Sequence, residues 1–308
     1  MALLLILQSL LQASLRMAAP LIYTSVGETY NQRAGVVNIG LEGIMLIGAV
    51  TAFGVTFYLK SIGLAVVAAA LVAGFFGLIF AYVTITLQAN QIVTGTAMNL
   101  IGLGLSSFVY RVAFRDLPGA RIEPLAPISI PLLNKIPFIG PVLFEQNALV
   151  YGALLLTIVA AFVMNKTMLG LTIRAVGEHP AAVATAGLPV SRLRYGAAIF
   201  GAMMAGVGGA YLPVAWGNTF VENMVAGRGF IALAIVVFGR WTPLGAFLAS
   251  ILFGFTYALQ LRLQTQNLRV AYQLLQVLPY IATLVIMVIL RGRSTQPKAM
   301  GAPYSERA

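Results

Sequence analysis

The stretch GLTIRAVGEHPAAVATAGLP occupies residues 170–189 and lies between long apolar runs. It is rich in alanine, carries charge and is punctuated by glycine and proline, in a chain in which charged residues make up only 9%. Charged side chains are costly inside hydrocarbon, so this stretch belongs outside it. We therefore expect membrane-crossing helices on both sides of the stretch, and a partner outside the membrane that contacts it.

Composition excludes an ordinary soluble domain. Hydrophobic residues make up 60% of the 308 residues, and the mean hydropathy is +0.92, which exceeds what one buried core can absorb. Only helices or closed barrels satisfy every backbone polar group within a bilayer. The apolar runs are continuous rather than alternating, which favours helices. The predicted fold class is all-α, a polytopic transmembrane helical bundle.

The apolar runs predict about nine spans, within a range of about eight to ten, because a helix needs roughly 20 apolar residues to cross the hydrocarbon core. The predicted spans are residues 3–26, 36–58, 62–84, 91–110, 147–165, 195–215, 229–241, 243–261 and 271–290. The run at 229–241 is short, and it is either part of a tight helical hairpin or re-entrant. Arg16 is the first basic residue. The first span therefore lacks the basic start of a removable signal peptide, and we expect it to be retained.

Basic residues gather in the loop of residues 166–194 and in the tail, which the positive-inside rule places in the cytoplasm. We expect one transmembrane domain at residues 1–293 and a disordered cytoplasmic tail at 294–308. Counting spans then places the proline-rich segment 112–146 outside, and the N-terminus outside if there are nine spans. That segment is either a lid or docking surface or a simple connecting loop. The same distribution argues that the net charge of +11 serves membrane topology and not nucleic-acid binding.

Polar residues inside the apolar runs are candidates for a substrate pathway. Asn38 and Glu42 lie in a glycine-rich run at the second span, which favours a broken helix there. An intramembrane carboxylate usually faces a wet cavity or the interior of a bundle, and broken helices hold polar ligands. Tight packing through glycine faces, with Glu42 as a structural hydrogen-bonding group, explains the same pattern. The pathway candidates are Asn31, Asn38, Glu42, Gln91, Thr94 and Asn99, with Tyr257 if the eighth span faces inward.

Small residues recur every four positions after residue 195. Ala197, Gly201, Ala205 and Gly209 share one helix face. Such a ladder lets helices approach closely in lipid, where association depends on packing and hydrogen bonds. We expect a packing element here.

The residue types that the chain lacks limit the chemistry that it can carry out. The chain has no cysteine and a single histidine, His179, outside every predicted span, so we expect no metal site. No Gly-Lys pair occurs, which excludes a P-loop. We therefore expect no enzyme and no cofactor bound by this chain.

Three motifs carry a family resemblance. GVVNIGLEGIMLIGA at 35–49, RAVGEHPAAVATAGLPVSRLR at 174–194 and GAMMAGVGGAYL at 201–212 resemble permeases of the branched-chain amino acid and simple-sugar group of ABC importers. The likeness is greatest to those paired with nucleoside-binding lipoproteins, and it spans most of residues 20–290. His179 stands where asparagine is commoner in the family.

The resemblance implies a role for the opening stretch. In such permeases a cytoplasmic coupling hairpin contacts the ATPase. The residues that match it here are Arg174, Gly177, Glu178, Ala181, Ala182 and Gly187. The predicted role of Glu178 is to anchor the hairpin, and Gly187 provides either close backbone approach or a helix end.

The resemblance also implies a function. The chain is expected to be the permease subunit of an ATP-driven importer in a bacterial or archaeal cytoplasmic membrane, carrying a small polar solute, most of all a nucleoside. Its implied partners are an ABC ATPase that uses ATP and Mg²⁺, a second permease or a second copy of this chain, an extracytoplasmic binding protein and membrane lipid. A sugar or branched-chain amino acid substrate stays open. The alternatives from other classes are an ion-coupled carrier, with Glu42 as its site and Arg16 as counter-charge, and a non-transporting scaffold.

Overall fold

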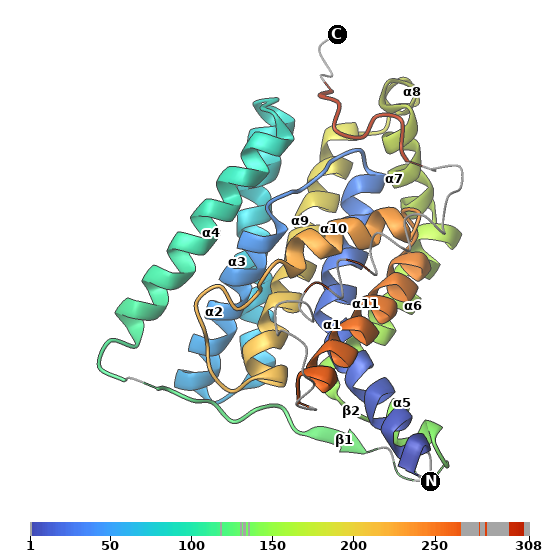
Figure 1. The fold of residues 1–308 in the computed structure, drawn as a ribbon. Coiled ribbons are helices and arrows are strands. Elements are labelled where there is room, and N and C mark those ends of the chain that lie inside the picture. Colours follow the sequence, from blue (N-terminus) through green and yellow to red (C-terminus); the bar gives the residue numbers. More distant parts are fainter. Residues whose placement is uncertain are drawn as a thin grey trace.

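A computed structural model describes residues 2–117, 119–129, 131, 134, 136–265, 277, 281 and 296–304. Helices dominate these residues (Figure 1). In chain order the elements are α1 (Ala2–Arg33), α2 (Leu41–Leu59), α3 (Ile62–Ala81), the π-helical turn η1 (Tyr82–Thr86), α4 (Gln91–Ala113), β1 (Pro127–Ser129), α5 (Ile139–Phe144), β2 (Glu145–Asn147), α6 (Ala148–Lys166), α7 (Met168–Glu178), α8 (Pro180–Thr185), α9 (Val190–Tyr211), the π-helical turn η3 (Leu212–Trp216), α10 (Arg228–Phe238) and α11 (Pro243–Thr265).

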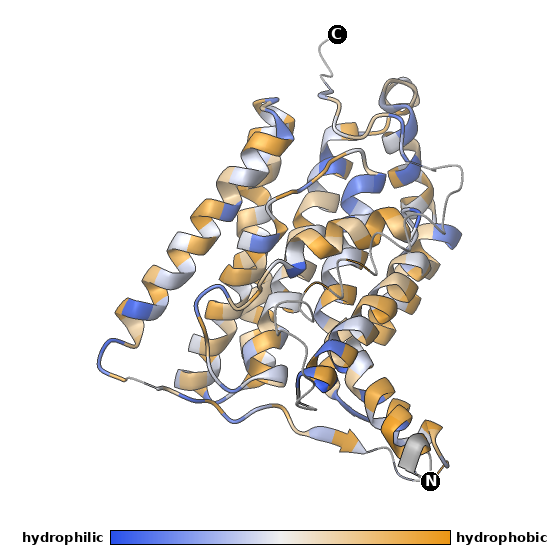
Figure 2. Ribbon diagram, viewed as in Figure 1, coloured by the Kyte–Doolittle hydropathy of each residue, from blue (hydrophilic) through white to orange (hydrophobic). Residues whose placement is uncertain are grey.

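The all-α bundle is confirmed. Within the described residues, 7 helical segments are long and apolar enough to cross a membrane: Leu4–Arg33, Leu41–Leu59, Ile62–Thr86, Gln91–Ala113, Ala148–Lys166, Val190–Trp216 and Pro243–Gln264. Figure 2 shows hydrophobic residues along most of their length. They match seven of the predicted spans. The predicted span at 271–290 lies outside the described residues, apart from residues 277 and 281.

The short run predicted at 229–241 is α10, which has only 11 residues. A helix of that length rises about 16 Å and cannot cross the hydrocarbon core alone. The loop of residues 217–227 leads from the end of η3 to the start of α10, and α11 follows after a short turn. Loop and helix together return the chain towards the end of the bundle where α11 begins (Figure 1).

The two ends of the bundle carry different segments (Figure 1). The hairpin of α7 and α8 lies at one end, together with residues 296–304. The N-terminus and the segment before α6 lie at the opposite end. Both segments predicted to be cytoplasmic therefore share one end.

The proline-rich segment 112–146 is held to the end of the bundle by backbone hydrogen bonds. The amide of Ile122 donates to the Asn218 carbonyl over 2.8 Å, and the amide of Leu125 donates to the Val214 carbonyl over 2.7 Å. β1 and β2 pair antiparallel further along. The prolines prevent a long helix, and the segment instead runs along the bundle end.

α9 is the central helix. It packs against α1, α2 and α3. In the segment Val190–Trp216, which joins α9 and η3, 78% of the most apolar 18-residue stretch is buried. On its predicted ladder, Gly201 faces Gly27 of α1, and a Cβ at Gly209 would overlap the Met45 carbonyl oxygen of α2. Ala197 and Ala205 are buried on the same helix. Small residues let α9 approach two neighbours at backbone distance.

Gly209→Val is expected to prevent stable folding. The added Cβ meets a backbone oxygen that cannot rotate away, so the cost exceeds the typical ~1–3 kcal/mol of overpacking. Gly196→Val is the matched control, because Gly196 is on α9 with no atom within 4 Å of the added Cβ. Detergent-solubilised protein is measured by size-exclusion chromatography and thermal unfolding. Equal stability of the two variants would contradict the packing.

Candidate functional site

The chain between α1 and α2 is not helical. Gly35 has a φ of +87°, a conformation that favours glycine, and α2 begins only at Leu41. The predicted second span thus starts five residues later than its apolar run at 36–58. Residues 34–40 are called the break from here on. Inside a membrane protein, backbone groups released by such a break need other partners.

Side chains provide those partners. The amide of Val37 donates to Gln91 Oε1 over 2.8 Å, and the amide of Gly40 donates to Asn38 Oδ1 over 2.9 Å. Asn99 Oδ1 accepts from the Gly43 amide over 2.9 Å, and its Nδ2 donates to the Ile39 carbonyl over 2.9 Å. The structure thus brings Asn38, Gln91 and Asn99 together as supports of the break.

Thr94 does not join this group. Its hydroxyl donates to the Asn90 carbonyl within α4 over 2.9 Å. Asn31 instead joins a carboxylate on α1, and Tyr257 lies against Arg228, whose guanidinium is 5.4 Å from the centre of the Tyr257 ring.

Glu42 joins the starts of two helices. Its own position is the first turn of α2, and its carboxylate accepts the Gly227 and Gly229 amides at the start of α10, each over 2.7 Å. A helix N-terminus favours such an anion. Gly229 is required at this contact because a Cβ there would overlap the Glu42 backbone. Of the two interpretations of Glu42 from the sequence, these contacts match the structural hydrogen-bonding group.

Arg16 does not pair with Glu42. It donates from Nε to Gln146 Oε1 over 3.1 Å and from Nη2 to the Glu145 carbonyl over 3.2 Å. The counter-charge considered for an ion-coupled carrier is therefore wrong: Arg16 joins α1 to β2, because the long guanidinium finds acceptors on the segment packed beside it.

Glu28 is a buried carboxylate that the sequence prediction missed. It is fully buried, and it accepts from Asn31 Nδ2, Gln32 Nε2 and the Asn38 amide, each over 3.0 Å. Gln32 Oε1 accepts in turn from Trp241 Nε1 over 2.7 Å. The first span was predicted to end at residue 26, which left Glu28 in a loop. Helical periodicity of Glu28 with Asn31 and Gln32 is the signal that would have found it.

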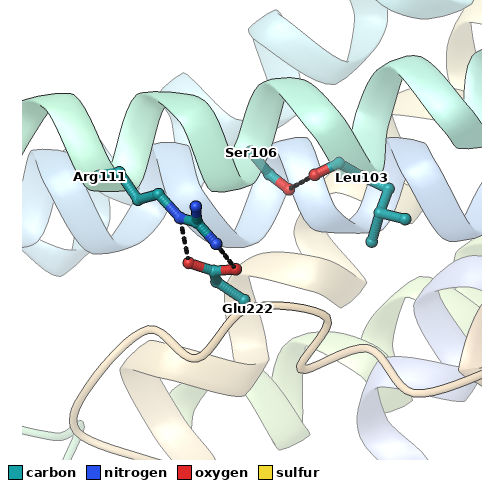
Figure 3. Close-up of polar contacts among 4 residues, drawn as sticks. All are labelled: Leu103, Ser106, Arg111 and Glu222. Carbon is teal, nitrogen blue, oxygen red and sulfur yellow. Dashed lines mark hydrogen bonds and ion pairs between the residues drawn. The ribbon is translucent and has the colours of Figure 1, made fainter.

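The loop before α10 is held by an ion pair. Arg111, in the last turn of α4, donates from Nε and Nη2 to both oxygens of Glu222 over 2.7 and 2.8 Å (Figure 3). The hydrogen bond from Arg111 holds the pKa of the Glu222 carboxyl below its usual value. A paired, bidentate geometry of this kind fixes orientation as well as distance, so the loop that delivers Gly227 is tied to α4.

The hairpin of α7 and α8 has its own caps and core. Thr167 Oγ1 accepts from the Gly170 amide at the start of α7 over 3.3 Å. Gly187, at φ +76°, ends α8: its amide donates to the Ala184 carbonyl, and the Leu188 amide donates to the Val183 carbonyl. This pair of bonds is the Schellman pattern of helix ends.

The predicted coupling residues lie on both surfaces of this hairpin. Gly177 is buried against the Arg33 carbonyl at the end of α1, and Glu178 lies close enough to Arg33 for their charges to interact. Arg174 Nε donates to the Gly170 carbonyl over 3.4 Å within α7. Ala181, Ala182 and Gly187 are exposed on the other surface.

That exposed surface is apolar and hollowed. A cavity of about 480 Å³ lies between the two helices. Its lining comprises Met168, Leu171, Thr172, Ala175, Glu178, His179, Ala182, Val183, Ala186 and Leu188. Met168 is 77% exposed and Leu171 is 52% exposed. We call this surface the hairpin hollow. Exposed apolar patches of this kind mark interaction sites.

The amino-acid sequence of the chain is similar to those of known transport proteins. A family model described as "Branched-chain amino acid transport system / permease component" matches residues 10–290. The nucleoside ABC transporter permease protein NupC of Lactococcus lactis subsp. cremoris is 36% identical over 309 residues, which cover 97% of each chain. The guanosine ABC transporter permease protein NupQ of Bacillus subtilis is 37% identical over 314 residues, again 97% of each chain.

A third relative is named for a different substrate. The putative glucose ABC transporter permease protein TsgC13 of Haloferax volcanii is 36% identical over 263 residues, 84% of this chain and 79% of that protein. No solved structure matches the chain. The family model matches residues 10–290, and two relatives are more than 30% identical along 97% of the chain. The relatives are transport subunits and not enzymes. This multi-pass membrane protein therefore belongs to the permease components of the branched-chain amino acid transport family, as a transport subunit.

Proposed function

We propose that the chain is the permease subunit of an ATP-driven nucleoside importer and that an ABC ATPase docks on the hairpin hollow. The observation that carries the docking site is the exposed apolar lining of the hollow, with Met168 77% exposed. The sequence has no P-loop, so ATP and Mg²⁺ belong to the partner chain. The hairpin end and the C-terminus are then cytoplasmic, in a bacterial or archaeal cytoplasmic membrane.

Motion of the hairpin has a direct route into the membrane domain. Gly177 of α7 packs on the Arg33 carbonyl. The Arg33 guanidinium donates from Nε to the Trp241 carbonyl over 2.6 Å and from Nη2 to the Arg240 carbonyl over 3.3 Å, in the turn between α10 and α11. α10 in turn holds Glu42 at the start of α2. ATPase closure that displaces α7 therefore acts on the start of α10 and, through Glu42, on the start of α2 beside the break.

The pathway is proposed to pass beside the break. A cavity of about 500 Å³ lies there, with Val37, Ile39, Asn90 and Gln91 in its lining. Gln91 supports the break through Oε1 and is proposed to present the rest of its amide to a polar solute. Asn38 and Asn99 keep the broken backbone in place, Asn31 donates to Glu28, and Glu42 holds the start of α10. Thr94 lies on the same helix as Gln91, one turn further along.

The remaining partners are proposed to contact one end and one side of the bundle. An extracytoplasmic binding protein is proposed to deliver substrate at the end that carries segment 112–146. A second permease, or a second copy of this chain, is proposed to complete the pathway within the lipid membrane. α4 suits this contact because only 22% of its most apolar 18-residue stretch is buried within one chain.

The substrate class rests on relatives along the whole chain. Two of them carry nucleoside or guanosine in their names and cover 97% of this chain. The glucose-named relative covers 84%, which makes a sugar the second candidate.

Uptake of radiolabelled guanosine, measured in cells with and without the gene, is expected to depend on the chain and to stop when ATP is depleted. An excess of unlabelled nucleoside is expected to compete, because both solutes would use one pathway. An excess of leucine is the control and is expected to have no effect. Chain-dependent uptake of labelled glucose but not of labelled guanosine would move the assignment to a sugar, and the same pattern for labelled leucine would move it to an amino acid.

A further inference from the structure

Residues 296–304, called the strap from here on, lie against the hairpin end of the bundle (Figure 1). The sequence predicts a disordered tail from residue 294, whereas these nine residues make backbone and side-chain contacts with segments far away in the chain. The difference has a physical reason: the partners are backbone carbonyls and a buried arginine that only the folded bundle brings together.

The strap makes one backbone hydrogen bond with α7 of the hairpin and one with the break. The Ala299 amide donates to the Gly177 carbonyl of α7 over 2.8 Å, and the Gly301 amide donates to the Gly35 carbonyl of the break over 3.0 Å. Gly301 has a φ of +76°, which glycine adopts without strain. The strap thus joins the hairpin to the break within three residues.

A buried arginine holds the next part of the strap. Arg194 of α9 is 2% exposed, and its Nη1 donates to the Ala302 carbonyl over 3.2 Å. Its guanidinium carbon lies 5.7 Å from the centre of the Tyr304 ring. Buried arginine needs acceptors and a π face of this kind to offset desolvation. A Cβ at Gly35 would lie 3.0 Å from Arg194 Nη2 and 3.1 Å from the Ala299 carbonyl oxygen, so break, strap and arginine fit closely.

Tyr304 also packs on the core of the hairpin. Its ring lies against the cluster of Val176, Val183 and Val190, which come from α7, α8 and the start of α9. The Tyr304 carbonyl accepts from Gln88 Nε2 over 3.3 Å. Displacement of the hairpin therefore also displaces the strap.

The strap borders the proposed pathway. Met300, Gly301 and Pro303 line the 500 Å³ cavity together with Gln91. A strap that follows the hairpin would change this cavity and the break at the same time.

We propose that the strap is a positioning element that transmits hairpin displacement to the break, in parallel with the Arg33 route. This inference rests on the proposed function. No residue of the strap lines the hairpin hollow in the described part of the chain. The strap contacts the break and the hairpin core, where Tyr304 packs on Val183 behind the hollow. Its loss should uncouple transport from ATP hydrolysis without preventing ATPase docking.

The test uses the whole complex, purified with a tag on the ATPase and reconstituted in liposomes. Tyr304→Ala removes the ring that packs on the hairpin core, and a chain ending at residue 295 removes the strap. Tyr304→Phe, which keeps the ring, and Lys298→Ala, at an exposed strap position, are the controls. We expect solute imported per ATP hydrolysed to fall roughly tenfold in Tyr304→Ala and in the shortened chain, within the usual range of coupling free energies. The amount of co-purified ATPase should stay the same, and both controls should behave as the wild type.

Hydrogen exchange of residues 34–40 gives a readout that does not depend on transport. These amides should exchange faster in Tyr304→Ala than in Tyr304→Phe, because the strap no longer holds the break. Wild-type transport per ATP in the shortened chain, or equal loss of ATPase binding and transport in Tyr304→Ala, would overturn the inference. A wild-type complex that contains no ATPase would instead refute the proposed function, so the two failures are distinguishable.

Discussion

The Gly187→Arg variant is expected to insert in the membrane and fold, yet to import no measurable solute. Gly187 is exposed, and no atom lies within 4 Å of an added Cβ, so arginine fits there sterically. Its φ of +76° costs a non-glycine residue about 1–2 kcal/mol, which a bundle of this size tolerates. Uptake fails because a long charged side chain would stand beside Ala186 and Leu188, which line the hairpin hollow.

Gly119→Arg is the matched control for this experiment. Gly119 has the same φ of +76° and equally open space, but it lies in the segment at the opposite end of the bundle. Both variants are compared by membrane yield and by the amount of co-purified ATPase. We expect ATPase to be lost with Gly187→Arg and retained with Gly119→Arg. Normal uptake by Gly187→Arg would refute docking on the hollow.

The Glu42→Ala variant is expected to lose both stability and uptake. The carboxylate satisfies two backbone amides at the start of α10, and each buried donor left without an acceptor costs about 1–3 kcal/mol. Glu42→Gln keeps one acceptor oxygen and should lose less. Glu123→Ala, at an exposed position outside the spans, is the control. Thermal unfolding in detergent and uptake in cells measure the two effects.

The same pair of variants separates the importer from a carrier centred on Glu42. If Glu42 holds the helix starts, uptake follows stability through the series from glutamate to glutamine to alanine. If Glu42 were a proton site, Glu42→Gln would stop transport at unchanged stability, and transport by the wild type would depend on the proton gradient. That pattern would contradict the structural role of Glu42.

Local signals in the sequence predicted much of the architecture. Continuous apolar runs identified seven helical segments that are long and apolar enough to cross a membrane, since length and hydropathy can both be read from a local stretch of sequence. Gly187 was recognised as a possible helix end, because the left-handed conformation at such ends is a local preference of glycine.

Long-range contacts explain what the sequence did not reveal. α1 continues to Arg33, and its polar last turns find partners far away in the chain: Trp241, more than 200 positions on, donates to Gln32. Arg16 was considered as a partner of Glu42, yet its acceptors lie 129 and 130 positions along the chain. Neither pairing leaves a periodic pattern, so only the folded bundle discloses it.

The central claim is that a separate ATPase drives transport through this chain by docking on the hairpin hollow. The most direct measurement is purification of the tagged protein from its native membranes in mild detergent, with identification of the co-purifying chains and an assay of ATP hydrolysis. The account predicts an ATPase in the wild-type sample that disappears from the Gly187→Arg sample at equal permease yield. Well-folded permease recovered without any ATPase or ATP hydrolysis would contradict it.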